Sequence, residues 1–189
     1  MNKGLRSGLV LLVLGIISGT LLAFVNYFTA PVIAVLEEQA QYDALKEFYY
    51  DVDDPNYASF KLSDDYNLSK VDIEDDYIQS IFVVKSKDSG EVSLGYLVSA
   101  NGYSSDAPVA MLIVVDSDLS IRGYKVISHK ETSGFGADIV DNDFNINVIT
   151  DLSGFDSVAH VTFTSNAIYE CFYQVSLRVV ADFGGDLVD

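Results

Sequence analysis

The feature that most constrains this chain is a long apolar run near its N-terminus. No charged residue occurs from Ser7 to Leu36, and Leu9–Val25 (LVLLVLGIISGTLLAFV) is almost continuously apolar. With Tyr27 and Phe28, the run covers the roughly 20 residues that a helix needs to cross a bilayer. A cleaved signal peptide is the alternative, but its apolar core has only about 7–15 residues, and no clean Ala-x-Ala cleavage site follows here. We therefore predict an uncleaved transmembrane helix that anchors the chain.

The charges beside this run predict its orientation. Lys3 and Arg6 precede the run and no acidic residue does, and positive flanks stay on the cytoplasmic side of a membrane. We expect the short N-terminus in the cytoplasm and the residues after about position 30 outside it. Gly15 and Gly19 form a small-xxx-small pair that allows another helix to pack closely, although glycines are also frequent in membrane spans without that role.

The remainder of the chain is strongly acidic. All 28 Asp and Glu residues follow position 36, together with only 9 of the 11 Lys and Arg residues, which gives this portion a formal charge of about −19. Such a surface repels nucleic acids and anionic lipid headgroups, so neither is an expected partner. The acidic stretch Asp72–Asp76 (DIEDD) lacks the alternating ligands and the glycine of a calcium loop, and we interpret it as a solvated acidic face.

The chain has a single cysteine, Cys171. An internal disulfide, a paired-cysteine haem attachment and a cysteine-ligated iron–sulfur cluster are therefore excluded. Any redox chemistry must come from an organic cofactor.

Two segments connect the apolar run to the rest of the chain. After Pro31, the apolar positions of residues 32–50 recur at helical spacing, which predicts a juxtamembrane helix. Residues 51–77 are polar, acidic and interrupted by Pro55, and we interpret them as a loose connection or an irregular lobe.

The next part of the chain is rich in predicted strands. Four stretches of β-branched and aromatic residues are separated by short turns: Ile78–Lys85, Val92–Ala100, Val109–Asp116 and Ile121–Ser128. Short connections favour antiparallel neighbours. Residues 129–138 form a glycine-bearing loop, 139–150 a short helix or strand, and 151–165 a second loop.

A helix is predicted at the C-terminal end, because apolar residues recur there at helical spacing: Ile168, Cys171, Phe172, Val175 and Val179. The fold class is thus α+β, with one mostly antiparallel sheet. We divide the chain into a cytoplasmic stub and anchor (1–30), a juxtamembrane helix with an acidic connection (31–77), and a folded domain (78–189).

One candidate site is the second loop, where Asp156–Asn166 reads DSVAHVTFTSN. It places Thr162, Thr164 and Ser165 just before the C-terminal helix. Hydroxyls and unpaired backbone N–H groups at a helix N-terminus suit a phosphate, because the donors and the positive dipole end point the same way. The alternative is that one hydroxyl merely caps the helix, but a cap does not require three hydroxyls in four residues.

The other candidate site is the loop His129–Gly136, HKETSGFG. Its two glycines allow the backbone to approach a flat ligand, and polar side chains lie beside them. It is not a dinucleotide fingerprint, since Ile139 stands where a third glycine is required. A plain structural turn is the alternative. The two histidines, His129 and His160, fall one in each loop, but no ligand spacing supports a metal site.

Together, the two loops resemble a known family. HKETSGFG is similar to the His-x-Glu-Thr-Pro-Gly-Leu-Gly loop of the FMN-binding domain shared by the G subunit of the Rnf electron-transport complex and the C subunit of sodium-translocating NADH:quinone reductase. Residues 156–165 resemble that family's Asp-x-x-Ser-Gly-Ala-Thr-x-Thr-Ser flavinylation motif. The order of the loops, the single span and the following helix also agree. The resemblance covers about residues 92–180, and the short chain favours the Rnf protein.

The resemblance implies specific roles for matching residues. Thr162 matches the threonine that is esterified by the FMN phosphate, and Asp156 matches the leading acid of the motif. The hydroxyls that hold the phosphate region correspond to Thr164 and Ser165. The loop residues that line the flavin ring correspond to Glu131, Thr132, Gly134 and Gly136.

This chain departs from the family pattern just before that threonine. Ala159, His160 and Val161 stand where the family has Ser-Gly-Ala, and Ser133 replaces the proline of the first loop. A histidine ring and a β-branched residue change the backbone context that a flavin transferase recognises. Covalent FMN, noncovalent FMN and a flavin-free domain therefore remain open at this point.

The resemblance implies a membrane-anchored, extracytoplasmic electron-transfer subunit rather than a free-standing enzyme. It would carry FMN on Thr162 within an Rnf-like complex that couples ferredoxin and NAD to ion transport. The implied partners are the other membrane subunits and a flavin transferase. The alternatives are a flavin-free structural subunit of the same kind of complex and a free-standing flavin reductase, which is disfavoured because no lipobox cysteine is present.

Overall fold

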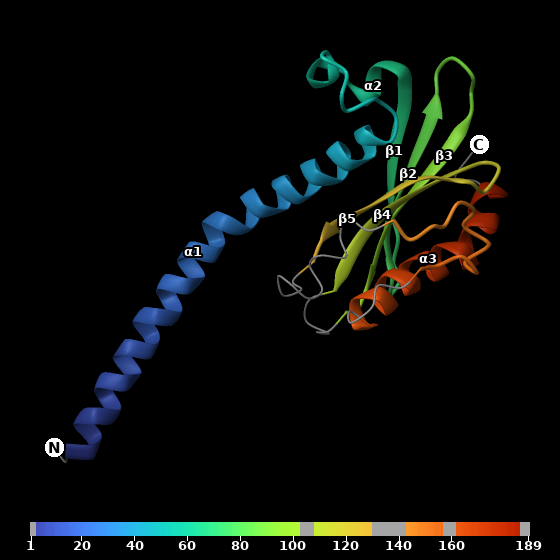
Figure 1. Cartoon of the computed structure of the whole chain (residues 1–189). Helices are drawn as coiled ribbons and strands as arrows, with labels where there is room; N and C mark the ends of the chain where they lie inside the picture. The colour runs from blue at the N-terminus through green and yellow to red at the C-terminus, as the bar shows by residue number, and fades with distance from the viewer. Residues whose placement is uncertain (1–2, 103–107, 130–142, 157–161, 186–189) are drawn as a thin grey trace. The chain divides into compact units, whose positions relative to one another are not determined.

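A computed structural model describes residues 3–102, 108–129, 143–156 and 162–185 of the chain (Figure 1). The chain divides into two compact units, Met1–Ala40 and Gln41–Asp189. Each unit is described separately below.

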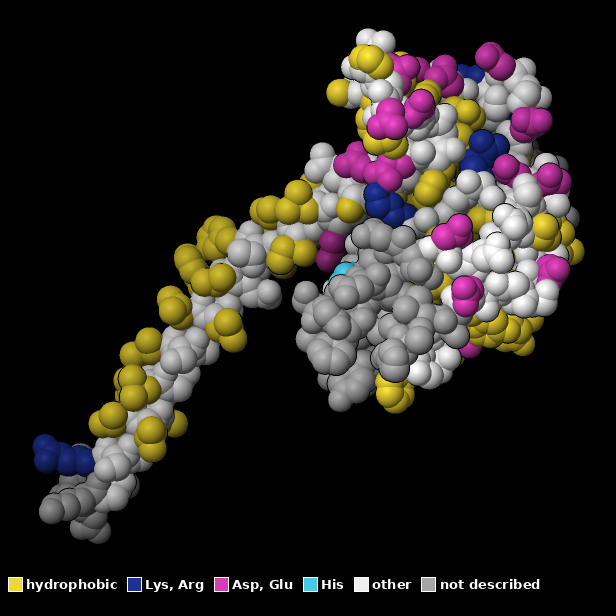
Figure 2. Space-filling view, viewed as in Figure 1, with side chains coloured by type: hydrophobic (Ala, Val, Ile, Leu, Met, Phe, Trp, Pro, Cys, Tyr) yellow, Lys and Arg dark blue, Asp and Glu magenta, His cyan; other side chains and the backbone are white. Residues whose placement is uncertain are grey.

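The first unit contains most of the helix α1 (Lys3–Glu47). The final turns of α1, from Gln41 onward, belong to the second unit. Apolar side chains follow one another along this helix (Figure 2). By length and composition, α1 is the one helix among the described residues that is able to cross a membrane. Pro31 lies inside α1, so the separate juxtamembrane helix predicted after this residue is instead part of one continuous helix. Proline is tolerated within apolar spans when the freed backbone groups are satisfied locally.

The second unit is built on a five-stranded sheet with the order β1-β2-β3-β4-β5, in which every neighbouring pair is antiparallel. The strands are β1 (Tyr66–Asp72), β2 (Ile78–Ser86), β3 (Val92–Ala100), β4 (Val109–Asp116) and β5 (Ile121–Ser128). Strands β2 to β5 lie where the apolar runs and turn residues predict them. The α+β class with an antiparallel sheet is confirmed.

The strand β1 was not predicted from the sequence. The segment 51–77, interpreted above as a loose connection, contains the short helices η1 (Tyr57–Ser59) and α2 (Leu62–Asp65) as well as β1. That interpretation is wrong for these elements. Strand β1 is an edge strand whose side chains are all at least partly exposed, so it lacks the apolar run that marks a buried strand. Its pairing with β2 supplies the backbone hydrogen bonds that define it.

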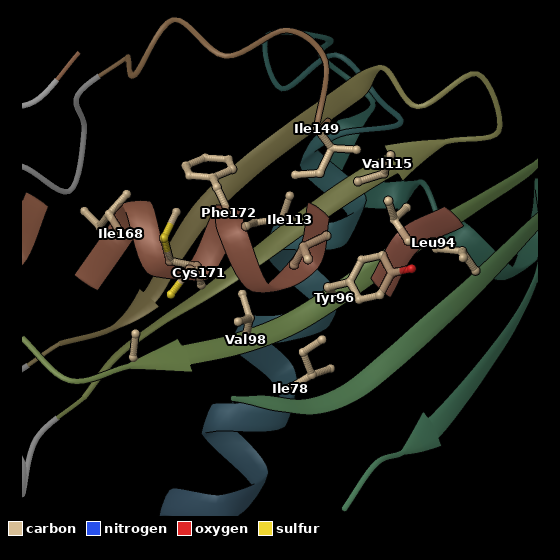
Figure 3. Packing of buried hydrophobic residues seen from close by; sticks show 14 of the residues in the cluster. Ile78, Leu94, Tyr96, Val98, Ile113, Val115, Ile149, Ile168, Cys171 and Phe172 are labelled. Carbon is tan, nitrogen blue, oxygen red and sulfur yellow. The ribbon is translucent and has the colours of Figure 1, made fainter. Parts of the chain in front are cut away.

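One face of the sheet is covered by the C-terminal helix α3 (Thr162–Phe183), and we call it the α3 face. The helix buries Ile168, Cys171 and Phe172 against strand residues such as Val98 and Ile113 (Figure 3). Near the end of α3, the Tyr96 hydroxyl donates a hydrogen bond of 3.0 Å to Asp182 Oδ2, and Arg178 Nε lies 2.9 Å from the same oxygen. These contacts hold the last turns of the helix on β3.

The opposite face is covered by the last turns of α1, with Ala44 and Leu45 in its core. The strand residues on this face are Phe82, Val84, Leu97, Leu112 and Val114. Phe48 packs over β5 at Gly123, where a side-chain Cβ would overlap its ring. Because both faces are covered, β2, β3 and β4 are buried at most positions rather than at alternate ones.

Candidate functional site

The two candidate loops adjoin the same end of the sheet. Pairing of Ala100 with Val109 and of Ala110 with Ser128 places the end of β3, the start of β4 and the end of β5 together. The first half of α3 lies toward this end, because Ile168 is on the side of Val98 whereas Leu94 is toward the other end of the helix (Figure 3). The first loop leaves the sheet here, directly after β5, and the second loop ends where α3 begins.

The helix α3 begins at Thr162, so the three hydroxyls of the second loop lie within its first turns. Thr162 is exposed, whereas Thr164 is 3% and Ser165 1% exposed. Thr164 and Ser165 lie inside the helix, beyond the position of a cap, and both are buried. Thr162 is therefore the hydroxyl of the three that a reagent or another protein can reach.

The start of α3 has the electrostatic character that a phosphate requires. Its first turn contains no acidic residue, although the chain as a whole carries a formal charge of −17. The helix dipole adds a partial positive charge at this end of α3. An exposed hydroxyl at this point thus fits attachment to a phosphate group.

A folded segment of residues 143–156 supports the start of α3. The rings of Phe144 and Phe155 stack with their centroids 5.3 Å apart, and the Asp156 N–H donates to the Phe144 carbonyl at 3.2 Å. Phe155 also packs edge-on against Tyr169, and Phe144 contacts Phe172. The segment is thereby attached to α3, and it leaves the side chain of Asp156 exposed next to the loop that leads to Thr162.

Tyr124 of β5 joins this segment to the sheet. Its hydroxyl accepts a hydrogen bond from the Phe144 N–H at 2.8 Å and donates one to Asp143 Oδ1 at 2.9 Å. Burial raises the pKa of Tyr124, so its hydroxyl remains a donor at neutral pH. The N–H of Asn145 and the Tyr124 hydroxyl lower the pKa of Asp143, which therefore remains an acceptor.

Two residues near the site were not predicted as contacts for a cofactor. His129 follows β5 directly, and its Nδ1 atom is buried without a hydrogen-bond partner among the described residues. Phe163, next to Thr162, exposes a large aromatic side chain. An unpaired buried nitrogen and an exposed ring are both typical of a surface that a ligand covers. The sequence signal for His129 is its place at the first position of HKETSGFG.

The other predicted positions lie outside the described residues. They are Glu131, Thr132, Gly134 and Gly136 of the first loop, together with Ala159, His160 and Val161 of the second. Within the described part of the chain, no group of three His, Cys, Asp or Glu side chains is arranged to hold a metal ion.

Two parts of the chain are similar to known protein families. Residues 1–48 match the family model described as the RnfG N-terminal region, and residues 102–175 match the model of the FMN-binding domain. The second match includes both candidate loops and Thr162.

Two curated relatives extend the similarity to most of the chain. The G subunit of an ion-translocating oxidoreductase complex from Methanosarcina acetivorans is 25% identical, with 92% of this chain and 93% of the relative covered. The G subunit of a proton-translocating ferredoxin:NAD(+) oxidoreductase complex from Clostridium ljungdahlii is also 25% identical, with 89% and 88% covered. The predicted resemblance to the FMN-binding domain family of Rnf G subunits is confirmed.

Proposed function

We propose that this chain, as a G-type subunit of an Rnf-like ion-translocating ferredoxin:NAD oxidoreductase complex, carries FMN on Thr162 and transfers electrons. The observation that carries the proposal is the exposed hydroxyl of Thr162 at the first position of α3, beside the buried Thr164 and Ser165. The match of residues 102–175 to the FMN-binding domain supports the choice of cofactor. Other subunits of such a complex are the expected partners.

The residues of the site fit the two ends of the cofactor. The Thr162 oxygen would attack the flavin-side phosphorus of a flavin dinucleotide, the P–O bond to AMP would break with AMP as the leaving group, and the hydroxyl proton would pass to solvent, which leaves FMN joined to Thr162 through a phosphoester. The positive dipole end at the start of α3 would stabilise the negative charge of that phosphate. Asp156, Glu131, Thr132, Gly134 and Gly136 remain the predicted contacts for the rest of the group, and we add His129 as a candidate. FMN supplies the redox chemistry, while the protein holds and orients it.

We further propose that α1 anchors the chain in the cell membrane. Its long apolar stretch supports a single span, and the basic residues Lys3 and Arg6 before it favour a cytoplasmic N-terminus. The acidic domain then lies on the extracytoplasmic side. A flavin transferase on that side is required to form the phosphoester.

The test of the proposal is the mass of the full chain produced together with a flavin transferase. We expect a mass increase that corresponds to FMN, and yellow fluorescence that persists after denaturation. Thr162→Ala should abolish both, whereas Thr162→Ser should retain part of the signal because it keeps a hydroxyl. Thr150→Ala is the matched control, since Thr150 is also exposed but lies outside the motif. An FMN adduct that persists in Thr162→Ala would contradict attachment at this residue.

A second variant distinguishes two explanations for a chain without FMN: a motif that the flavin transferase no longer recognises, and a domain that holds no flavin. If the natural chain takes up no FMN, replacing His160 by Gly and Val161 by Ala restores the family pattern at these two positions. Flavinylation of that double variant would show that only the sequence context has changed. Failure of both proteins would support the alternative of a structural subunit without flavin.

A further inference from the structure

A stripe of exposed apolar side chains runs along the outer side of α3. It consists of Tyr169, Tyr173, Leu177 and Val180, and all four side chains are exposed. They are spaced by three or four residues, so they lie on one face of the helix. The buried residues of α3 lie on the other face, toward the sheet. We call these four residues the α3 stripe.

The α3 stripe begins near the proposed attachment residue. Thr162 precedes Tyr169 by seven residues, which is close to two full turns, and it is exposed like the stripe itself. From Thr162 to Val180 this face extends about 27 Å. A protein seated on the stripe would therefore touch the residue that carries the flavin.

The charges around the stripe define what can cover it. Beyond residue 142, the described part of the chain contains five acidic residues and one basic residue, Arg178, which is paired with Asp182 at 2.9 Å. Contact between Phe155 and Tyr169 places the acidic segment 143–156 directly beside the stripe. The stripe is thus an uncharged band, and the exposed side chains of Asp143, Asp151 and Asp156 form an acidic border at its Tyr169 end. A second copy of the chain or an anionic lipid surface would meet like charge there.

We propose that the α3 stripe is the docking surface for a partner subunit that presents an apolar patch bordered by Lys and Arg residues. The proposal builds on the function proposed above, because the contact would begin at the flavinylated Thr162. Exposed apolar patches with a polar border are typical of protein interaction sites. The acidic border guides the approach of a basic partner and rejects acidic ones.

The test uses the full chain assembled in native membranes, with the photoreactive residue p-benzoylphenylalanine in place of Tyr173. Irradiation should produce an adduct with another protein subunit, identified by mass spectrometry. The same substitution at Val52, an exposed apolar residue outside the stripe, should produce none. An adduct with lipid, an adduct with a second copy of the chain, or no adduct at position 173 would overturn the proposal.

A pair of charge variants tests the apolar character of the contact. Val180 is 59% exposed and Val52 is 55% exposed, so the same change to Glu can be compared at similar sites. Val180→Glu should lower the adduct yield at position 173 about tenfold, which corresponds to roughly 1.4 kcal/mol of lost association energy. Val52→Glu should leave the yield unchanged. Equal yields in the two variants would contradict the proposed surface.

The same preparations distinguish the two proposals. Intact mass reports whether FMN is attached to Thr162, and the adduct reports whether the stripe is covered. A flavinylated protein without an adduct would reject only the docking surface. An adduct formed by a protein without FMN would reject only the flavin proposal.

Discussion

The two faces of the sheet differ in what covers them and in what they do. The α3 face carries the larger core, with a set of aromatic rings from β5, the 143–156 segment and α3, and the buried contact between Tyr96 and Asp182. The opposite face carries a smaller core under the last turns of α1. The candidate site belongs to the α3 face, because both Thr162 and the segment that supports it lie there.

This difference indicates a division of roles. Packing on the α3 face positions the start of α3, where the flavin is proposed to attach. Packing on the opposite face joins the end of α1 to the sheet. A change on either face should reduce stability, but only a change on the α3 face should affect flavin attachment at the same time.

The largest effect is expected for Phe172→Ala on the α3 face, compared with Leu45→Ala on the opposite face. Both side chains are fully buried, and removal should cost about 3–5 kcal/mol for Phe172 and about 2–5 kcal/mol for Leu45. Phe172 also packs against Tyr124 and Phe144, so its loss should loosen the support of Thr162.

Urea unfolding of the full chain in detergent would measure the two losses of stability, and intact mass would measure FMN on the folded fraction. We expect less FMN in Phe172→Ala and normal FMN in Leu45→Ala. The same FMN content in both variants would contradict the division of roles.

A smaller loss is expected for Gly123→Ala on the opposite face. The new Cβ would overlap the ring of Phe48, and such overpacking costs about 1–3 kcal/mol. Gly95→Ala is the matched control in the same core, because there the nearest side-chain atoms, in Leu45 and Phe82, are 3.4 Å away. Its cost should be lower.

The double variant Gly123→Ala with Phe48→Ala provides an internal check. Removal of the ring should make the alanine at position 123 nearly neutral when it is compared with Phe48→Ala alone. Additive losses in urea unfolding would show that the contact with Phe48 is not the cause. FMN content should be unchanged in each of these variants.

The smallest effect at neutral pH is expected for Tyr49→Phe, also on the opposite side of the sheet. The Tyr49 hydroxyl is buried, and burial raises its pKa to about 12, above the ordinary value of about 10. Between these values the unfolded chain releases this proton and the folded chain keeps it. Stability should therefore fall as the pH rises from about 10 to 12, by about 2 kcal/mol for this group.

Tyr49→Phe should remove that part of the alkaline loss while changing stability little at pH 7. Urea unfolding at several pH values would give the slope for both proteins. Identical slopes above pH 10 would show that Tyr49 does not keep its proton in the folded state. A loss of FMN in this variant would contradict the separation between the two faces.

The strands β2 to β5 could be predicted almost residue by residue. Their apolar runs end at turn residues such as Asp116 and Asn101-Gly102, and the central strands, which are covered on both faces, have apolar side chains on both of them. Strand β1 could not be predicted, because its alternation is weak and its identity depends on hydrogen bonds with β2. The sequence around Pro31 also predicts a break between two helices, whereas α1 is continuous through this proline.

The sequence by itself determined the apolar span, the acidic domain, the fold class and the two loops that mark the family, because each is encoded in local composition or in a short motif. Only the tertiary structure decided which hydroxyl is accessible: Thr164 and Ser165 are buried, whereas Thr162 is exposed. It also revealed the His129 nitrogen, which has no hydrogen-bond partner among the described residues, and the α3 stripe. Whether a side chain is exposed or hydrogen-bonded depends on which segments pack against it, and those segments are distant from it in the sequence.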